Sequence, residues 1–222
     1  LSVQAVFMGP VTYPWGWKTT PVLYNWNDAA VQAIGAILWT NLLYPPPGWE
    51  SVTNHPYKGH PVNMSFALYS DVCPQRCKKW AQGPDMILGD DMASWTKALT
   101  TGVLRADDFI SDGRPINDIH WWGSYLTWMH SEPACETNPM PPPVGLESPL
   151  GFRLSWHLSS NCLPATTLTN LFVPITNCHE VYYCTVTQFW KLPGPYYEHE
   201  YQYYVDLNDP AIPGASPWLE LK

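Results

Sequence analysis

Proline is the feature that most restricts how this chain folds. The 222 residues include 24 prolines, roughly twice the usual share. Because proline lacks a backbone N–H and its ring clashes with the preceding turn, this density excludes long uninterrupted helices. Only 14% of the residues are charged, while 13 Trp and 13 Tyr are present. A disordered chain is poor in aromatic residues, so the sequence predicts a folded domain built from strands and turns.

The charge balance excludes one large class of partners. The formal net charge is −8, and the longest basic run, Arg76 to Lys79, is short. Nucleic-acid binding draws its affinity from clustered Lys and Arg, so we expect no nucleic-acid partner. No stretch reaches the roughly 18 apolar residues of a membrane-spanning helix. The sequence starts at Leu1 without a signal-peptide pattern, which predicts a mature fragment.

Strand-like patterns run through most of the chain. The length suits one large all-β domain, so we expect a single domain over residues 1–222, mainly β with a few short helices. Two stretches show a helical pattern, and the shorter of them begins after Ala93. One good helix pattern begins at a cap, Asn27 or Asp28, and continues with apolar residues at three to four residue spacing, namely Val31, Ile34, Leu38 and Leu42.

A strand pattern carries a glycosylation sequon. Residues 62–69 alternate so that Met64, Phe66 and Leu68 point to one face. Asn63 and Ser65 then face outward, as a glycan on the sequon Asn63-Met64-Ser65 requires. The sequence therefore predicts glycosylation at Asn63.

Six cysteines form an even set that permits fifteen pairings. Cys73 and Cys77 are close enough in sequence to close a small loop, as are Cys178 and Cys184, which leaves Cys135 with Cys162. A metal site would need paired Cys-x-x-Cys knuckles or histidines at ligand spacing, and His179 directly follows Cys178. We therefore expect disulfides and an oxidising compartment. Our hypothesis for the pairing is Cys73–Cys77, Cys135–Cys162 and Cys178–Cys184.

The search for chemistry predicts no catalytic residue, no metal and no cofactor. No nucleophile elbow, His-Glu-x-x-His motif, phosphate-binding loop or dinucleotide fingerprint occurs. Paired carboxylates or a calcium site could come from Asp85, Asp90 and Asp91, but we interpret this group as a solvated turn. We interpret His199, between Glu198 and Glu200, as an edge-strand residue with ordinary salt partners. No distinctive Ser or Cys accompanies His120 with Asp118 or His130 with Glu132, so we place these histidines at the rim of an aromatic core.

Four rings form the densest aromatic patch: Trp121, Trp122, Tyr125 and Trp128. Most such rings belong to a core, but a chain with 13 Trp must expose some of them. Exposed Trp and Tyr are favoured binding hot spots because they bury a large area at little entropy cost. The patch is therefore our hypothesis for a binding surface.

Several short motifs follow one another in a fixed order along the chain: Trp17 to Asp28, Val62 to Phe66, Cys73 with Cys77, Pro149 to Leu154, Asn161 to Pro164, Cys178 with Cys184, Leu192 to Pro195 and Pro217 to Glu220. In this order they resemble the envelope surface subunits of betaretroviruses and their endogenous relatives, over nearly the whole chain. The late cluster here has two cysteines where the family has three. The resemblance thus indicates a divergent, receptor-binding fragment.

The resemblance implies recognition without catalysis. The chain would bind a host cell-surface receptor protein to trigger membrane fusion and entry, and would associate with a transmembrane fusion subunit in a trimer of heterodimers. Its location would be extracellular, at the virion surface or at the host plasma membrane through the fusion subunit. Residues 1–48 and 148–222 would form a β-sandwich-like core near that subunit, with Leu1–Phe7 paired to Tyr196–Lys222. A loop-rich, Pro- and aromatic-rich lobe, 49–147, would face the receptor.

A second class of function fits the same composition. Trp and Tyr platforms also stack on sugars, so a secreted carbohydrate-binding or glycoside-hydrolysing domain is the alternative. The carboxylate pairs would then have a purpose. A glycan array and a hydrolase screen distinguish it from a receptor-binding fragment.

Overall fold

Two seven-stranded sheets make up the fold. The computed structural model describes residues 1–9, 11–22, 29–34, 38–44, 56–71, 77–97, 102–130, 142, 148–188, 196–212 and 214. Within these residues there is no α-helix, and a short 3-10 turn, η3 (Ile175–Asn177), joins two strands. No helix in this part of the chain is long and apolar enough to cross a membrane. The fold is mainly β with a sandwich-like core, as predicted.

Sheet 1 has the strand order β12-β11-β1-β8-β9-β3-β4. Most neighbours in it are antiparallel, but β1 and β8 run parallel. Its strands are β1 (Ser2–Phe7), β3 (Val31–Ile34), β4 (Trp39–Asn41), β8 (Trp95–Lys97), β9 (Val103–Ala106), β11 (Gly151–Ser160) and β12 (Leu163–Pro174).

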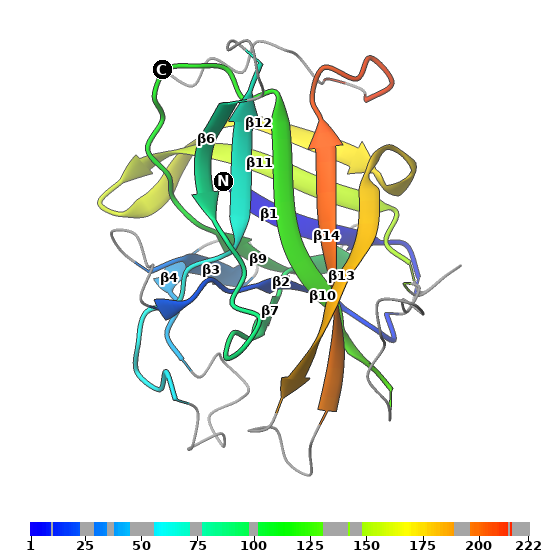
Figure 1. The fold of residues 1–222 in the computed structure, drawn as a ribbon. Coiled ribbons are helices and arrows are strands. Elements are labelled where there is room, and N and C mark those ends of the chain that lie inside the picture. Colours follow the sequence, from blue (N-terminus) through cyan, green and yellow to red (C-terminus); the bar gives the residue numbers. More distant parts are fainter. Residues whose placement is uncertain are drawn as a thin grey trace.

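Sheet 2 has the strand order β13-β14-β10-β2-β7. In addition, β5 pairs with β10, and β6 pairs with β5. In Figure 1, β10, β13 and β14 run upright in front of β1, β11 and β12, which cross behind them. The strands of sheet 2 are β2 (Trp15–Lys18), β5 (Phe66–Ser70), β6 (Cys77–Gln82), β7 (Asp91–Ala93), β10 (Asp118–His130), β13 (His179–Gln188) and β14 (Tyr196–Asp206).

Aromatic rings fill the space between the sheets. Phe152 of β11 packs against three rings of sheet 2, with ring centroids 5.1 Å from Trp15, 5.2 Å from Trp121 and 4.9 Å from Tyr203. All four side chains are fully buried. Aromatic pairs at such distances contribute about 0.5–1.5 kcal/mol each beyond the area they bury. The two sheets are therefore joined by a ring cluster that residues from both halves of the sequence supply.

The predicted helix after Asp28 is wrong. Residues 31–34 and 39–41 form an antiparallel hairpin, β3 and β4, and β3 also pairs with β9. Val31, Gln32 and Ala33 are all buried, whereas Leu38 is 74% exposed, which does not fit one apolar helix face. A helix would leave the edge of β9 without a partner, so tertiary pairing overrides the local pattern. The helical pattern after Ala93 is also wrong, because β7 and β8 occupy that region.

The predicted division into two lobes is not seen. β1 lies in sheet 1 and β14 in sheet 2, so the two terminal segments do not pair as the resemblance implied. The middle segment, 49–147, supplies β8 and β9 beside β1, and it supplies β10 beside β14. Strands from all parts of the chain thus alternate within both sheets. The described residues form one interleaved unit.

Candidate functional site

The predicted ring surface belongs to the core. Trp121, Trp122 and Tyr125 expose 0%, 8% and 1% of their surface. Trp128 is partly buried, with its ring centroid 4.7 Å from that of Tyr13. Their strand, β10, lies between β14 on one side and β2 and β5 on the other. The prediction of a receptor surface at these four rings is therefore corrected, because three of the rings are buried and the fourth packs against Tyr13.

The predicted glycosylation site is buried. Asn63 is fully covered, and its Oδ1 accepts a hydrogen bond from the Ala30 amide at 3.3 Å. The sequon serine is covered as well, since Ser65 Oγ donates to the backbone oxygen of Lys18 at 2.9 Å. A glycan has no room at this position in the folded chain, so the Asn63 prediction is corrected. The apolar–polar alternation predicted that Asn63 and Ser65 face solvent, but residues 62–65 are buried on both faces of the strand.

Two of the three predicted disulfides are not formed. Cys162, Cys178 and Cys184 are thiols. Cys184 lies six residues beyond Cys178 along an extended strand, which advances about 3.3 Å per residue. Bridged Cα atoms lie only about 4.4–6.8 Å apart, so these two cannot meet. Cys77 is disulfide-bonded, while Cys73 and Cys135 lie outside the described residues, and the Cys73–Cys77 pairing stays a prediction.

The aspartates near residue 90 do not form a solvated turn. Asp85, Asp90 and Asp91 are all buried. Asp85 accepts hydrogen bonds from the amides of Ile87 and Leu88 at 3.0 and 2.9 Å, and it also accepts one from the Tyr57 hydroxyl at 3.1 Å. This aspartate therefore stabilises the turn that leads into β7. The solvated interpretation is corrected for all three residues.

The edge-strand interpretation of His199 is also wrong. β14 lies between β13 and β10, and His199 is buried with its Nδ1 3.0 Å from Thr185 Oγ1. Its neighbours Glu198 and Glu200 are buried too. Residues that the sequence placed on a solvated edge therefore lie inside the molecule.

One buried ionic cluster combines two of the sequence motifs. Lys18 Nζ donates to Glu200 Oε1 at 2.7 Å, to Asp91 Oδ2 at 3.2 Å and to the Gly89 carbonyl at 3.0 Å. Burial favours the neutral amine, but Asp91, Glu200 and Glu198 outweigh it and hold the pKa of Lys18 well above its usual range. Burial and the nearby Asp91 raise the pKa of Glu200 well above its usual range. The cluster is sealed from solvent, so these carboxylates cannot act on a substrate.

His120 and Asp118 are neighbours, but they do not form part of a nucleophilic triad. His120 Nε2 lies 3.3 Å from Asp118 Oδ1, and its Nδ1 accepts a hydrogen bond from the Gln202 side chain at 3.0 Å. The His120 ring stacks on Tyr204, which stacks on His179. Both ring nitrogens of His120 are therefore engaged with residues that are not nucleophiles. The side chains of His130 and Glu132 lie outside the described residues.

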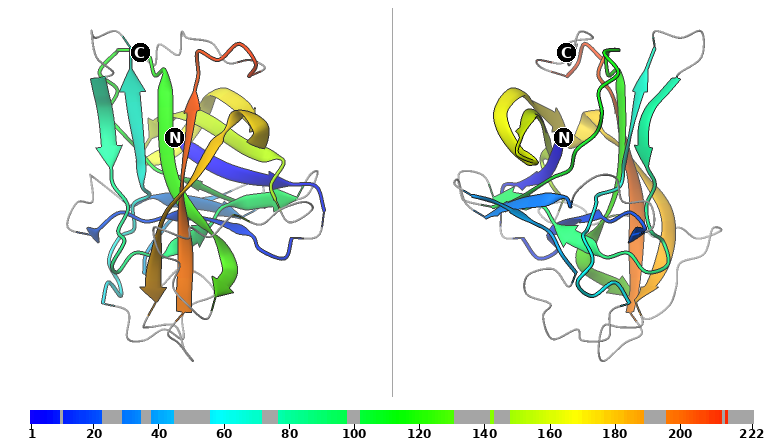
Figure 2. Two further views of the ribbon diagram at one scale, coloured as in Figure 1. Left: turned by 45° about the vertical axis from the view of Figure 1, so that its right-hand side comes forward. Right: turned by 90° about the vertical axis from the view of Figure 1, so that its left-hand side faces the viewer.

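A pocket missed by the sequence analysis opens beside the β11–β12 hairpin. The hairpin turn consists of Asn161 and Cys162, both with positive φ, at 51° and 61°, as a two-residue turn of type I′ requires. In the right view of Figure 2 the hairpin curls outward beside the N-terminus. The pocket has a volume of about 170 Å³. Its wall is mainly apolar and includes Val31, Phe109, Trp156, Leu158, Leu163 and Leu168.

Two titratable groups in the pocket wall carry no charge near neutral pH. Burial raises the pKa of Asp107 to about 8. Burial lowers the pKa of His157 to about 4. Between these values the aspartic acid is protonated and the imidazole is neutral. These two side chains therefore add no charge to the pocket wall between those pH values.

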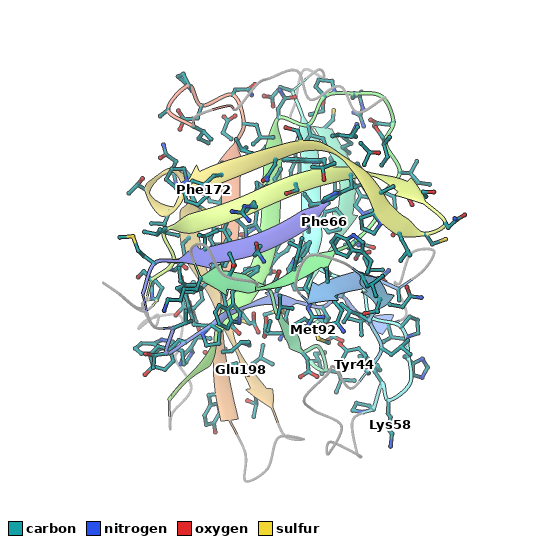
Figure 3. All side chains as sticks on the ribbon, turned by 180° about the vertical axis from the view of Figure 1, so that it is seen from behind. Tyr44, Lys58, Phe66, Met92, Phe172 and Glu198 are labelled. Atoms are coloured by element: carbon teal, nitrogen blue, oxygen red, sulfur yellow. The ribbon has the colours of Figure 1, made fainter. Side chains whose placement is uncertain are left out.

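Exposed apolar side chains occur in the wall of this pocket and farther along β12. Leu158 and Leu168 expose 46% and 44% of their surface, and both line the pocket. Phe172, which Figure 3 labels on β12, is also exposed. β12 is the outermost strand of sheet 1, and within the described residues it pairs only with β11. The sequence does contain a signal for this surface. Apolar residues such as Leu158 and Leu168 occur on both sides of the Asn161-Cys162 turn, in the part of the hairpin that extends beyond the core.

A comparison with protein families gives one match. Residues 78–210, more than half of the chain, match a family described as a domain of unknown function, DUF7901. The chain belongs to the DUF7901 family. No curated protein and no solved structure matches the chain, and nothing found links it to retroviral envelope proteins.

The DUF7901 match does not coincide with the folded unit. It starts within β6 and includes β7 to β14, so the hairpin, the pocket wall from Ala106 to Leu168 and the carboxylates of the ionic cluster belong to it. β1, β2 and β5 lie outside the match, yet each pairs with a strand inside it. Lys18, the cation of the cluster, is also supplied from outside the DUF7901 match.

Proposed function

We propose that this chain is a non-catalytic recognition domain that binds a protein partner through the β11–β12 hairpin and the adjoining pocket. The observation that carries the proposal is the pair Leu158 and Leu168, which are exposed and line the pocket. Large exposed apolar patches are typical of interaction sites because water solvates them poorly. The buried state of the paired carboxylates removes the best candidates for hydrolysis.

The size of the pocket favours one group of a larger partner. Pockets for whole small-molecule ligands measure about 300–1,000 Å³, whereas this one measures about 170 Å³. A single apolar side chain of a protein suits such a volume. The outer edge of β12 offers backbone groups for an added strand, and a pocket beside such an edge supplies side-chain specificity.

The motif order along the chain suggests the more specific form of this proposal. A betaretroviral-type envelope surface subunit would bind a host cell-surface receptor outside the cell and would associate with a fusion subunit. This form rests on the resemblance alone, since the sequon and the ring patch that accompanied it are buried. The hairpin takes the place of the ring patch as the proposed receptor surface.

Binding to cultured mammalian cells tests the proposal. We expect saturable binding of the soluble chain that protease treatment of the cells abolishes. Leu158→Asp and Leu168→Asp place a charge in the apolar patch and should each weaken binding by about tenfold or more, because hot-spot residues cost at least about 2 kcal/mol. Flow cytometry with the labelled chain measures the loss.

The matched control is Ile87→Asp, at a residue that is 76% exposed and does not line the pocket. This variant should bind like the parent chain. Binding that survives protease but is lost after deglycosylation of the cells, with a signal on a glycan array, would favour the carbohydrate-binding alternative. Equal binding by all three variants would exclude the hairpin as the surface.

A further inference from the structure

We propose that Asp91, Glu198 and Glu200 form a binding site for one divalent cation of the calcium class. One side-chain oxygen of each residue lies within 4.8 Å of the others, and all three side chains are buried. Calcium binds carboxylate oxygens at about 2.3–2.6 Å, so two ligands on opposite sides of the ion lie about 5 Å apart. The spacing of the three oxygens therefore matches one ion.

Two oxygens of this cluster lack a hydrogen-bond donor. Lys18 Nζ donates one hydrogen bond each to Asp91 Oδ2, to Glu200 Oε1 and to the Gly89 carbonyl, so its three N–H groups are all used. No amide, hydroxyl or ammonium group of the described residues donates to the remaining atoms, Asp91 Oδ1 and Glu200 Oε2. A buried polar atom without a partner is costly. The side-chain hydrogen bond between Glu200 and Asp91 requires a proton on one of them, and a cation would replace that proton while Lys18 keeps its bonds.

The charge balance indicates a divalent ion. Three ionised carboxylates carry three negative charges, and Lys18 returns one positive charge. Buried net charge is strongly unfavourable in a low-dielectric interior. Among these four side chains, one proton leaves a net charge of −1, whereas one divalent ion brings the net charge to zero.

The donor atoms indicate a hard cation. The three charged ligands are carboxylates, the donors that calcium and magnesium prefer over the softer metals. Cys184 is the register partner of Glu200, but burial raises the pKa of its thiol to about 11, and it does not belong to the close group of ligands. Calcium suits the site better than magnesium, because calcium accepts flexible coordination geometry and bidentate carboxylates, whereas magnesium demands a near-ideal octahedron.

Calcium titration of the chelator-treated full chain tests this site. We expect one saturable site by calorimetry and a higher melting temperature with calcium than with chelator. Glu198→Gln and Asp91→Asn should each weaken calcium binding by about tenfold or more, since ligand charge sets the affinity. Asp112→Asn, which neutralises an exposed carboxylate elsewhere, should bind like the parent chain.

A second readout uses the unmodified chain, in case a variant fails to fold. Manganese at substoichiometric concentration should broaden the amide signals of Asp91 and of residues 198–200 first, and calcium should reverse the broadening. The absence of saturable calcium binding would overturn the proposal, and the cluster would then hold protons only. Broadening confined to other parts of the chain, or undiminished binding by folded Glu198→Gln, would overturn it as well.

Discussion

Asp107 joins three segments of the chain through one carboxyl group. Its Oδ2 accepts hydrogen bonds from the Met64 amide at 2.6 Å and the Gln82 side chain at 3.0 Å, and its Oδ1 accepts one from the Asp108 amide at 2.9 Å. Burial nevertheless raises its pKa to about 8. The loss of hydration therefore destabilises the ionised form more than these hydrogen bonds stabilise it.

This shift predicts a stability that falls as pH rises. Between about pH 4 and pH 8 the folded chain keeps the Asp107 proton and the unfolded chain releases it. The free energy of unfolding should therefore decrease with rising pH by up to about 1.4 kcal/mol per unit from this group. Above pH 8 the contribution levels off. Urea denaturation of the parent chain and of Asp107→Asn across this range measures the difference, and identical slopes would show that Asp107 is ionised in the fold.

At the level of residues, the sequence identified candidates but not their surroundings. Asp91 and the Glu198-His199-Glu200 group were both recognised as possible sites, yet each was expected to be solvated. Their burial depends on β14 and β7 lying near the same lysine of β2, and these strands are far apart in the sequence. Spacing along the chain carries no information on such long-range neighbours.

β2 and β10 are neighbouring strands of sheet 2 and approach each other closely near the core. Gly123 pairs with Trp17, and Gly16 pairs with the next residue of β10, Ser124. A Cβ atom on Gly123 would collide with the backbone oxygen of Gly16 and with the Trp15 ring. The absence of a side chain at this point therefore allows the two strands to approach.

Gly123→Ala should destabilise the fold by about 1–3 kcal/mol, because overpacking in a rigid core displaces backbone. Gly83→Ala is the matched control, since a Cβ there meets no atom within 4 Å. Thermal unfolding monitored by circular dichroism compares the two. Equal melting temperatures would mean that β2 and β10 can move apart without cost.

At the level of elements, proline density and alternation predicted the strand class correctly. They failed where a pattern fits two structures. Val31, Ile34, Leu38 and Leu42 suit a helix face, but β9 supplies a strand edge that pairs with 31–34. The turn at Asn161-Cys162 was not predicted, and the pocket beside it also needs Val31 and Phe109 from other segments.

The interleaving of strands makes the whole chain one folding unit. β1 pairs with β8, β9 and β11, so its partners come from both the middle and the last part of the sequence. β10 likewise pairs with β2, β5 and β14. Removing any long segment exposes buried sheet edges and part of the ring cluster.

The segment 49–147 should therefore be unfolded when it is produced alone. It would lose β1, β2 and β14, and with them most partners of β8, β9 and β10. Amide signals in its NMR spectrum should be poorly dispersed, while the full chain should unfold in a single cooperative transition. A dispersed spectrum for the fragment would restore the two-lobe organisation that the sequence suggested.

The covered position of Asn63 bears on how the protein can be produced. In a eukaryotic secretory route the acceptor sequence is read on the nascent polypeptide, before the sheets close. An oligosaccharide attached then would have to be accommodated where Ala30 and Thr20 now pack, so only chains that escape the modification can complete this fold. Synthesis in a host without this modification avoids the conflict.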